Sequence, residues 1–134
     1  MSYPMSEAAV LAGCKHLLEL LRNEGLLVWK RISTTGIPVG DQTRRAIFVK
    51  NPAQGMADIM VFLKSDPPKT LHIELKSKTG RLSEAQEKWR DELKAMGHDT
   101  YYLVRSVQEL EKVLIDNGVV HWSLNRRAHE CAGD

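Results

Sequence analysis

Two acidic residues and one lysine stand in otherwise apolar, strand-like segments of this chain. Asp58 precedes the run Ile59–Leu63, and Glu74 and Lys76 lie near the end of a second run, Leu71–Ser77. Side chains two positions apart on a strand share a face, so Glu74 and Lys76 project together. An unpaired charge in an apolar strand is costly, which favours a role for these charges as a group.

A short turn between the two runs predicts that the carboxylates come together. The prolines of Ser65-Asp66-Pro67-Pro68 force a turn, so the runs are expected to form an antiparallel pair. Asp58 and Glu74 are each eight residues from Asp66, and a register slip of one or two residues leaves them near each other. Two adjacent carboxylates repel unless a cation lies between them, and hard oxygen ligands suit Mg²⁺ or Mn²⁺. We therefore predict a magnesium or manganese site.

A divalent cation held by few protein oxygens is suited to phosphodiester hydrolysis. Such a cation keeps bound waters, lowers their pKa and also binds a phosphate oxygen. Lys76 would orient the attacking water or stabilise charge developing on the phosphate. The alternative is an ordinary ion pair between Glu74 and Lys76 on a solvated strand, since Glu-x-Lys alone is a weak motif. His72 is predicted to be a packed histidine on the opposite face of the strand from Glu74.

The elements that position these residues follow from apolar periodicity and capping signals. We expect helices at 6–25, 83–96 and 106–117, strands at 26–32, 46–49, 55–63, 71–77, 100–104 and 119–124, and a turn-rich loop at 34–40. This order predicts an α/β fold with a mixed central sheet flanked by helices. We expect a single domain with a core of about residues 6–124 and a frayed tail at 125–134.

Composition excludes several classes of protein. The 134 residues suffice for one core, and a net charge of +2 excludes a histone-like polycation. The two cysteines, near opposite ends of the chain, do not suggest a secreted disulfide framework, and no apolar run approaches the roughly 20 residues of a membrane span. We expect an intracellular, cytoplasmic protein with free thiols and no membrane contact.

The ordered motifs of the chain resemble those of the VRR-Nuc domain, a branch of the PD-(D/E)xK nuclease superfamily. They are Gly55-Met56-Ala57-Asp58, then Glu74-Leu75-Lys76, then Gly80-Arg81-Leu82-Ser83 and Gln86. The resemblance extends from about residue 7 to about residue 110 and implies an αβββαβ nuclease core, a divalent metal and cleavage of DNA, often branched. Small stand-alone members, typical of phages, resemble dimeric resolvases of four-way (Holliday) junctions. Ala57 stands where the superfamily name has proline, which removes no ligand.

The resemblance also implies roles for individual residues. Asp58 and Glu74 match the metal-binding carboxylates, and Lys76 matches the catalytic lysine. Gln86 matches the glutamine of the following helix. The backbone carbonyl of Leu75 is implied as a further metal ligand.

Two of the implied roles have structural alternatives. For the family's helical acid we choose Glu7, although an acid near a helix N-terminus also complements the helix dipole. Glu19 and Glu24 are further candidates. Gln86 can instead close a capping box onto the backbone of Ser83, and the two roles of Gln86 are not obviously compatible.

Positive charge is concentrated around the expected site. Residues 26–50 hold five basic side chains against one acidic, a net +4, and residues 64–81 hold five against two, a net +3. Phosphate neutralisation requires such clusters, whereas the alternative is ordinary solvated surface. We expect DNA contacts from Arg44, Arg45, Lys50, Lys78 and Arg81.

The sequence thus predicts a Mg²⁺- or Mn²⁺-dependent DNA endonuclease, structure-selective on branched DNA in the manner of a four-way junction resolvase. A resolvase cuts two strands symmetrically, so we expect a homodimer with two sites. The alternatives are a nuclease directed to flaps or nicks and a DNA-binding module that keeps the nuclease fold without cleaving. The resemblance favours a 5′-phosphate product.

Overall fold

The structure is a computed structural model that describes residues 6–32, 37–39, 47–49 and 55–124, with only the backbone described at 37–39 and 47–49. Its elements are α1 (Glu7–Asn23), β1 (Leu27–Arg31), β2 (Ile37–Val39), β3 (Ile47–Val49), β4 (Ile59–Leu63), β5 (Lys69–Leu75), α2 (Glu84–Ala95), β6 (Tyr101–Val104) and α3 (Val107–Asp116). The expected DNA contacts Arg44, Arg45 and Lys50, and the expected tail at 125–134, lie outside the described residues.

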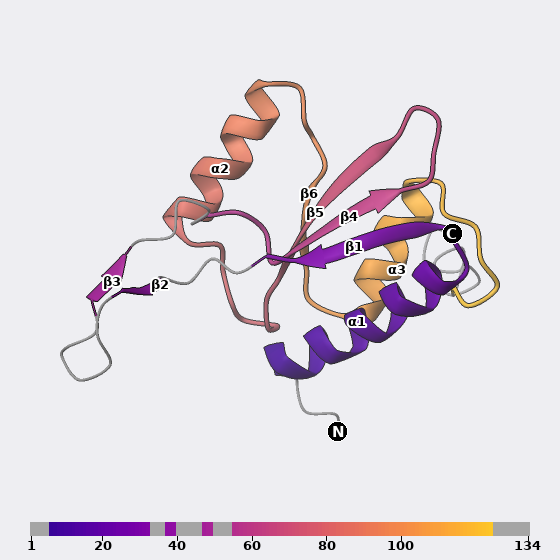
Figure 1. The fold of residues 1–134 in the computed structure, drawn as a ribbon, viewed down its shortest axis with the longest axis horizontal. Helices are drawn as coiled ribbons and strands as arrows, with labels where there is room; N and C mark the ends of the chain where they lie inside the picture. The colour runs from indigo at the N-terminus through magenta and orange to yellow at the C-terminus, as the bar shows by residue number, and fades with distance from the viewer. Residues whose placement is uncertain (1–5, 33–36, 40–46, 50–54, 125–134) are drawn as a thin grey trace.

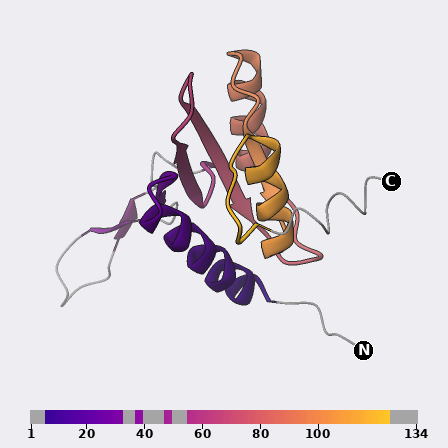
Figure 2. The same cartoon turned by 90° about the vertical axis from the view of Figure 1, so that its right-hand side faces the viewer.

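A four-stranded sheet in the order β1-β4-β5-β6 forms the centre of the fold (Figure 1). β4 is antiparallel to both β1 and β5, and β6 pairs parallel with β5. Together with α1 and α2 these strands give the order αβββαβ, so the predicted α/β class with a mixed sheet flanked by helices is confirmed. β2 and β3 pair with each other and form a ribbon that projects from the main sheet in both views (Figures 1 and 2).

The core lies between the sheet and the adjacent helices α1 and α3. Ser6, the first residue of the helix expected at 6–25, caps α1, because its hydroxyl accepts a hydrogen bond from the Ala9 N–H. The apolar stripe of α1 is buried, and it packs in one cluster with inward-facing residues of the sheet and with α3. Burial raises the pKa of the Cys14 thiol in this stripe to about 11. Among the helices in the described ranges, none is long and apolar enough to cross a membrane.

The two faces of β5 carry different side chains. Leu71, Ile73 and Leu75 belong to the core cluster, whereas His72 and Glu74 alternate with them and lie buried on the other face. The prediction that His72 lies on the opposite face from Glu74 was wrong. The two residues are two positions apart in a regular strand and therefore share a face.

Two short elements also differ from expectation. No strand forms at 119–124: Val119 and Leu124 are buried in the core, but the chain between them closes a turn through the Leu124 N–H and the His121 carbonyl. β2 forms inside the stretch predicted as a loop, despite Pro38. Proline is tolerated there because each strand of a two-stranded ribbon is an edge strand.

Candidate active site

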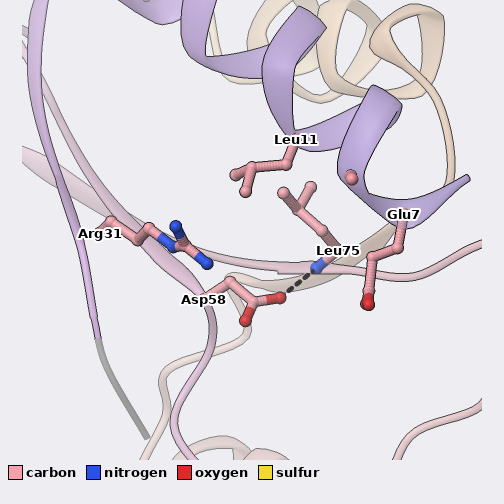
Figure 3. A pocket seen from close by; sticks show the side chains of 6 residues that line it. Glu7, Leu11, Arg31, Asp58 and Leu75 are labelled. Atoms are coloured by element: carbon pink, nitrogen blue, oxygen red, sulfur yellow. Dashed lines mark hydrogen bonds between the residues drawn. The ribbon is translucent and has the colours of Figure 1, made fainter.

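Asp58 and Glu74 come together at one end of the β4–β5 pair. β4 and β5 are in register with Ile59 opposite Ile73. Asp58 directly precedes Ile59 and Glu74 directly follows Ile73, so they hold the next pair of opposite positions. The Oδ2 atom of Asp58 accepts a hydrogen bond of 2.8 Å from the Leu75 N–H (Figure 3). The carboxylate of Asp58 is therefore fixed against the end of β5, beside Glu74.

Glu74 is a buried carboxyl group whose hydrogen-bond partners are incomplete. Its side chain is 2% exposed, and its Oε1 atom accepts a hydrogen bond of 2.7 Å from the Gln86 amide. The Oε2 atom is buried without a hydrogen-bond partner. Burial, followed by the neighbouring Asp58, raises the pKa of Glu74 to about 8, and Lys76 opposes this shift. An unpartnered carboxylate oxygen beside a second carboxylate fits a hard divalent cation.

This raised pKa gives a pH dependence of stability in metal-free protein. Between 4.5, the ordinary pKa of the side chain, and about 8, folded Glu74 retains a proton that the unfolded chain has lost. The free energy of unfolding attributable to Glu74 therefore falls as the pH rises through this window. We expect Glu74→Gln in EDTA to flatten the decline in melting temperature between these pH values. An unchanged decline in the variant would show that Glu74 is not the titrating group.

Gln86 uses the two ends of its amide for two different contacts. Its Oε1 atom accepts a hydrogen bond of 2.8 Å from the Ser83 N–H and so closes the capping box of α2, while its Nε2 atom donates to Glu74. The capping contact and the contact with the site are thus compatible. Gly55 brings α2 close to the chain leading to Asp58: its φ is +96°, and an added Cβ would lie 2.6 Å from the Ala85 carbonyl oxygen.

The backbone of β5 orients one further oxygen toward Asp58. Lys76 donates its N–H to the Val104 carbonyl at the end of β6, and backbone groups alternate in direction along a strand. Leu75 therefore directs both its N–H and its carbonyl to the other side, where Asp58 accepts the N–H. In the described ranges no three His, Cys, Asp or Glu side chains come close enough to bind one metal ion. The two carboxylates would need backbone or water oxygens to complete a coordination shell.

A pocket of about 230 Å³ opens beside Asp58. Its walls are Glu7, Ala8, Leu11, Arg31, Asp58 and Leu75, from α1, β1 and the ends of β4 and β5 (Figure 3). Glu7 lies in the first turn of α1 and contributes to the raised pKa of Glu74, so it is electrostatically coupled to the site.

The other two acids of α1 lie elsewhere. Glu19 accepts a hydrogen bond from the Trp29 indole, and Glu24 lies 4.0 Å from His121. Glu19 is twelve residues along the helix from Glu7, a separation of about 18 Å. Glu7 is consequently the acid of α1 that the structure brings to the pocket.

Arg31 is a pocket residue that was not predicted from the sequence. It pairs with Ile59 in the register of β1 and β4, so it shares the face of the sheet that packs on α1. Its guanidinium group extends toward the space between α1 and Asp58 (Figure 3). Among described carboxylates none forms an ion pair with it within 4.0 Å. Its alternation with Leu27 and Trp29, both facing α1, was the available sequence signal.

The remaining predicted cations lie in the segment between β5 and α2. Lys76 is half-buried on the face of Glu74, and Lys78 and Arg81 are exposed. In the part of the chain that the structure describes, the ammonium group of Lys76 has no hydrogen-bond partner within 3.5 Å and no acidic partner within 4.0 Å. A phosphate group that approaches Glu74 would therefore meet an unpaired ammonium group.

The fold and this acidic end of the sheet define an α/β domain with a nuclease-like core. The chain belongs to the VRR-NUC domain family, which matches residues 11–107 and so contains Asp58, Glu74, Lys76 and Gln86. Glu7 lies just before the matched range. Family membership makes the protein a nuclease, and therefore a hydrolase. No curated protein and no solved structure matches the chain.

Proposed function

We propose that this nuclease is a Mg²⁺- or Mn²⁺-dependent DNA endonuclease. The observation that carries the proposal is the buried, unpartnered Oε2 atom of Glu74 beside the carboxylate of Asp58. These two side chains, with the Leu75 carbonyl, would hold the cation. Because a cation binds the carboxylate rather than the carboxylic acid, its affinity should rise with pH toward the pKa of Glu74.

The residues around the carboxylates have separate tasks in this mechanism. When bound, a divalent cation stabilises negative charge on the phosphate and makes a water a better nucleophile. Gln86 holds Glu74 in place through its amide. Lys76 contacts a phosphate oxygen and stabilises the charge that develops there. Glu7 lines the same pocket as Asp58 and orients the attacking water.

The substrate we propose is branched DNA, with a four-way junction as the preferred form. Symmetrical cutting of two strands needs two equal sites, so we propose that the chain acts as a homodimer, with a mass in solution of twice 15.2 kDa. Lys78 and Arg81 beside the site, with Arg44, Arg45 and Lys50, would contact phosphates. We place this activity in the cytoplasm, where thiols such as that of Cys14 stay reduced.

A substrate comparison tests this proposal. Purified protein is incubated with four-way, flap, nicked and linear duplex DNA, with Mn²⁺ or with EDTA, and the cuts are mapped. We expect symmetrical cuts in the four-way junction that require Mn²⁺ and leave 5′-phosphates. Preferred cutting of flaps or nicks would support the alternative nuclease, and folded protein that binds but cuts none of the substrates would support the non-cleaving module.

Arg31 provides a test of where the DNA lies. Its guanidinium group borders the pocket beside Asp58, so we propose that it contacts a phosphate of the bound strand. Arg31→Ala should weaken DNA binding about tenfold and reduce the salt dependence of binding by about one counterion. The matched control is Arg22→Ala, because Arg22 lies fifteen residues along α1 from Glu7, a separation of about 22 Å. Equal losses in both variants would contradict a specific contact by Arg31.

A further inference from the structure

The connection between β5 and α2, residues 76–83, is held by the side chain of Arg105. The Nη1 atom of Arg105 donates to the carbonyl oxygens of Ser77 at 2.6 Å, Lys78 at 3.1 Å and Gly80 at 2.7 Å. Nη1 carries two hydrogens, so one hydrogen is shared between two of these oxygens. Three carbonyl groups from four consecutive residues thus converge on one permanent cation.

Arg105 is itself anchored on the opposite side. It directly follows β6, and its backbone N–H donates to the carboxylate of Glu109 in the first turn of α3. Among the described acidic side chains none pairs with its guanidinium group within 4.0 Å. A half-buried cation without an acidic partner needs these carbonyl oxygens, so the arginine and the shape of the segment depend on each other.

The held segment packs against Lys76. A Cβ atom added at Gly80 would lie 3.4 Å from the Cβ and 3.5 Å from the Cδ of Lys76. The backbone of Gly80 therefore lies next to the aliphatic part of the lysine side chain, with room for no more than a methyl group between them. The Gly80 N–H also donates to the Ser77 hydroxyl at 3.1 Å, which keeps the turn tight. Gly80 is thus fixed by Arg105 from one side and by Ser77 from the other.

We propose that Arg105 is a positioning residue for cleavage, acting through Gly80 on Lys76. By holding the Gly80 carbonyl, Arg105 fixes the surface on which the stem of Lys76 lies, and so the place of its ammonium group beside Glu74. The inference rests on the proposed role of Lys76. Arg105 touches neither the carboxylates nor the pocket, so its loss should slow the cleavage of fully bound DNA.

The test compares Arg105→Ala and Arg105→Lys in single-turnover cleavage with Mn²⁺ and in DNA binding with Ca²⁺. Misplacement of a catalytic group by about 1 Å can lower a rate roughly 100-fold, so we expect Arg105→Ala to lower the rate by roughly 10- to 100-fold. Because Lys78 and Arg81 lie in the held segment, the dissociation constant is measured for each variant, and the loss of rate should persist when all the DNA is bound by enzyme. Arg105→Lys keeps the charge but not the forked guanidinium group, so its rate should lie between those of the wild type and of Arg105→Ala. It is the variant to use if Arg105→Ala does not fold.

A control and a rescue separate positioning from loss of charge or stability. Arg22→Ala removes an exposed arginine that pairs with Glu19 on α1, and it should cleave like the wild type. Added methylguanidinium should restore part of the rate of Arg105→Ala, because it can occupy the space between the three carbonyls. It should not restore the rate of Lys76→Ala.

Two outcomes would overturn the inference. One is a folded Arg105→Ala that cleaves at the wild-type rate, and the other is a loss of rate fully explained by weaker DNA binding. Amide hydrogen exchange at Gly80, measured without DNA, should be faster in Arg105→Ala. If the wild type cleaves nothing with Mn²⁺, the proposed function fails. The Gly80 exchange then still reports whether Arg105 holds the segment, and an unchanged exchange rate would overturn the structural half of the inference.

Discussion

Asp58→Asn and Glu74→Gln are each expected to lower DNA cleavage by at least about 1000-fold, while DNA binding in Ca²⁺-free buffer stays within about twofold of the wild type. The reason is that each substitution keeps the size of the side chain but removes one of the two charges that would bind the cation. Glu74→Gln also removes a buried charge that lacks a full set of partners. That variant should therefore be at least as stable as the wild type at pH 8 in EDTA.

The control for these substitutions is Asp66→Asn. Asp66 is exposed in the turn between β4 and β5, at the opposite end of this strand pair from Asp58. The Asp66→Asn variant should cleave DNA like the wild type. If both site variants fold and still cleave at wild-type rates, the carboxylates serve structure and the nuclease reaction takes place elsewhere.

Lys76→Met is expected to lower the rate of cleavage by roughly 100- to 1000-fold, with little change in DNA affinity. Its ammonium group would stabilise charge that develops only in the transition state, so its removal affects the rate more than binding. Single-turnover rates at saturating enzyme measure the effect directly. Lys69→Met is the matched control, because Lys69 is exposed at the other end of β5. A rate loss in Lys76→Met that vanishes at saturating enzyme would assign the lysine to binding instead.

The sequence was sufficient for the main sheet because local signals agreed with the tertiary contacts. The capping residues Ser6, Ser83 and Ser106 mark the starts of the three helices, and each hydroxyl accepts the expected backbone N–H. The prolines after Asp66 set the turn, and the register of β4 and β5 followed from it. At 119–124 the apolar residues looked like a strand, but their burial depends on the core beneath them.

The candidate site was predictable where charge and spacing carried the information. Asp58 and Glu74 interrupt apolar runs at equal distances from one turn, which is visible without a structure. The dual contact of Gln86 depends on the placement of α2 against β5. Arg31 and Arg105 come from β1 and from the end of β6, and their neighbours at the site are far away in sequence. Periodicity reports the face of a strand but not which distant loop lies above it.

We propose above all that Asp58 and Glu74 together bind one divalent cation. The most direct measurement is a crystal structure of the protein grown with Mn²⁺ and recorded at the manganese absorption edge. We expect one anomalous peak within about 2.2 Å of a carboxylate oxygen of both residues, with the Leu75 carbonyl as a third protein ligand. A peak at any other place, or no peak between these carboxylates at saturating Mn²⁺ and pH 8, would contradict it.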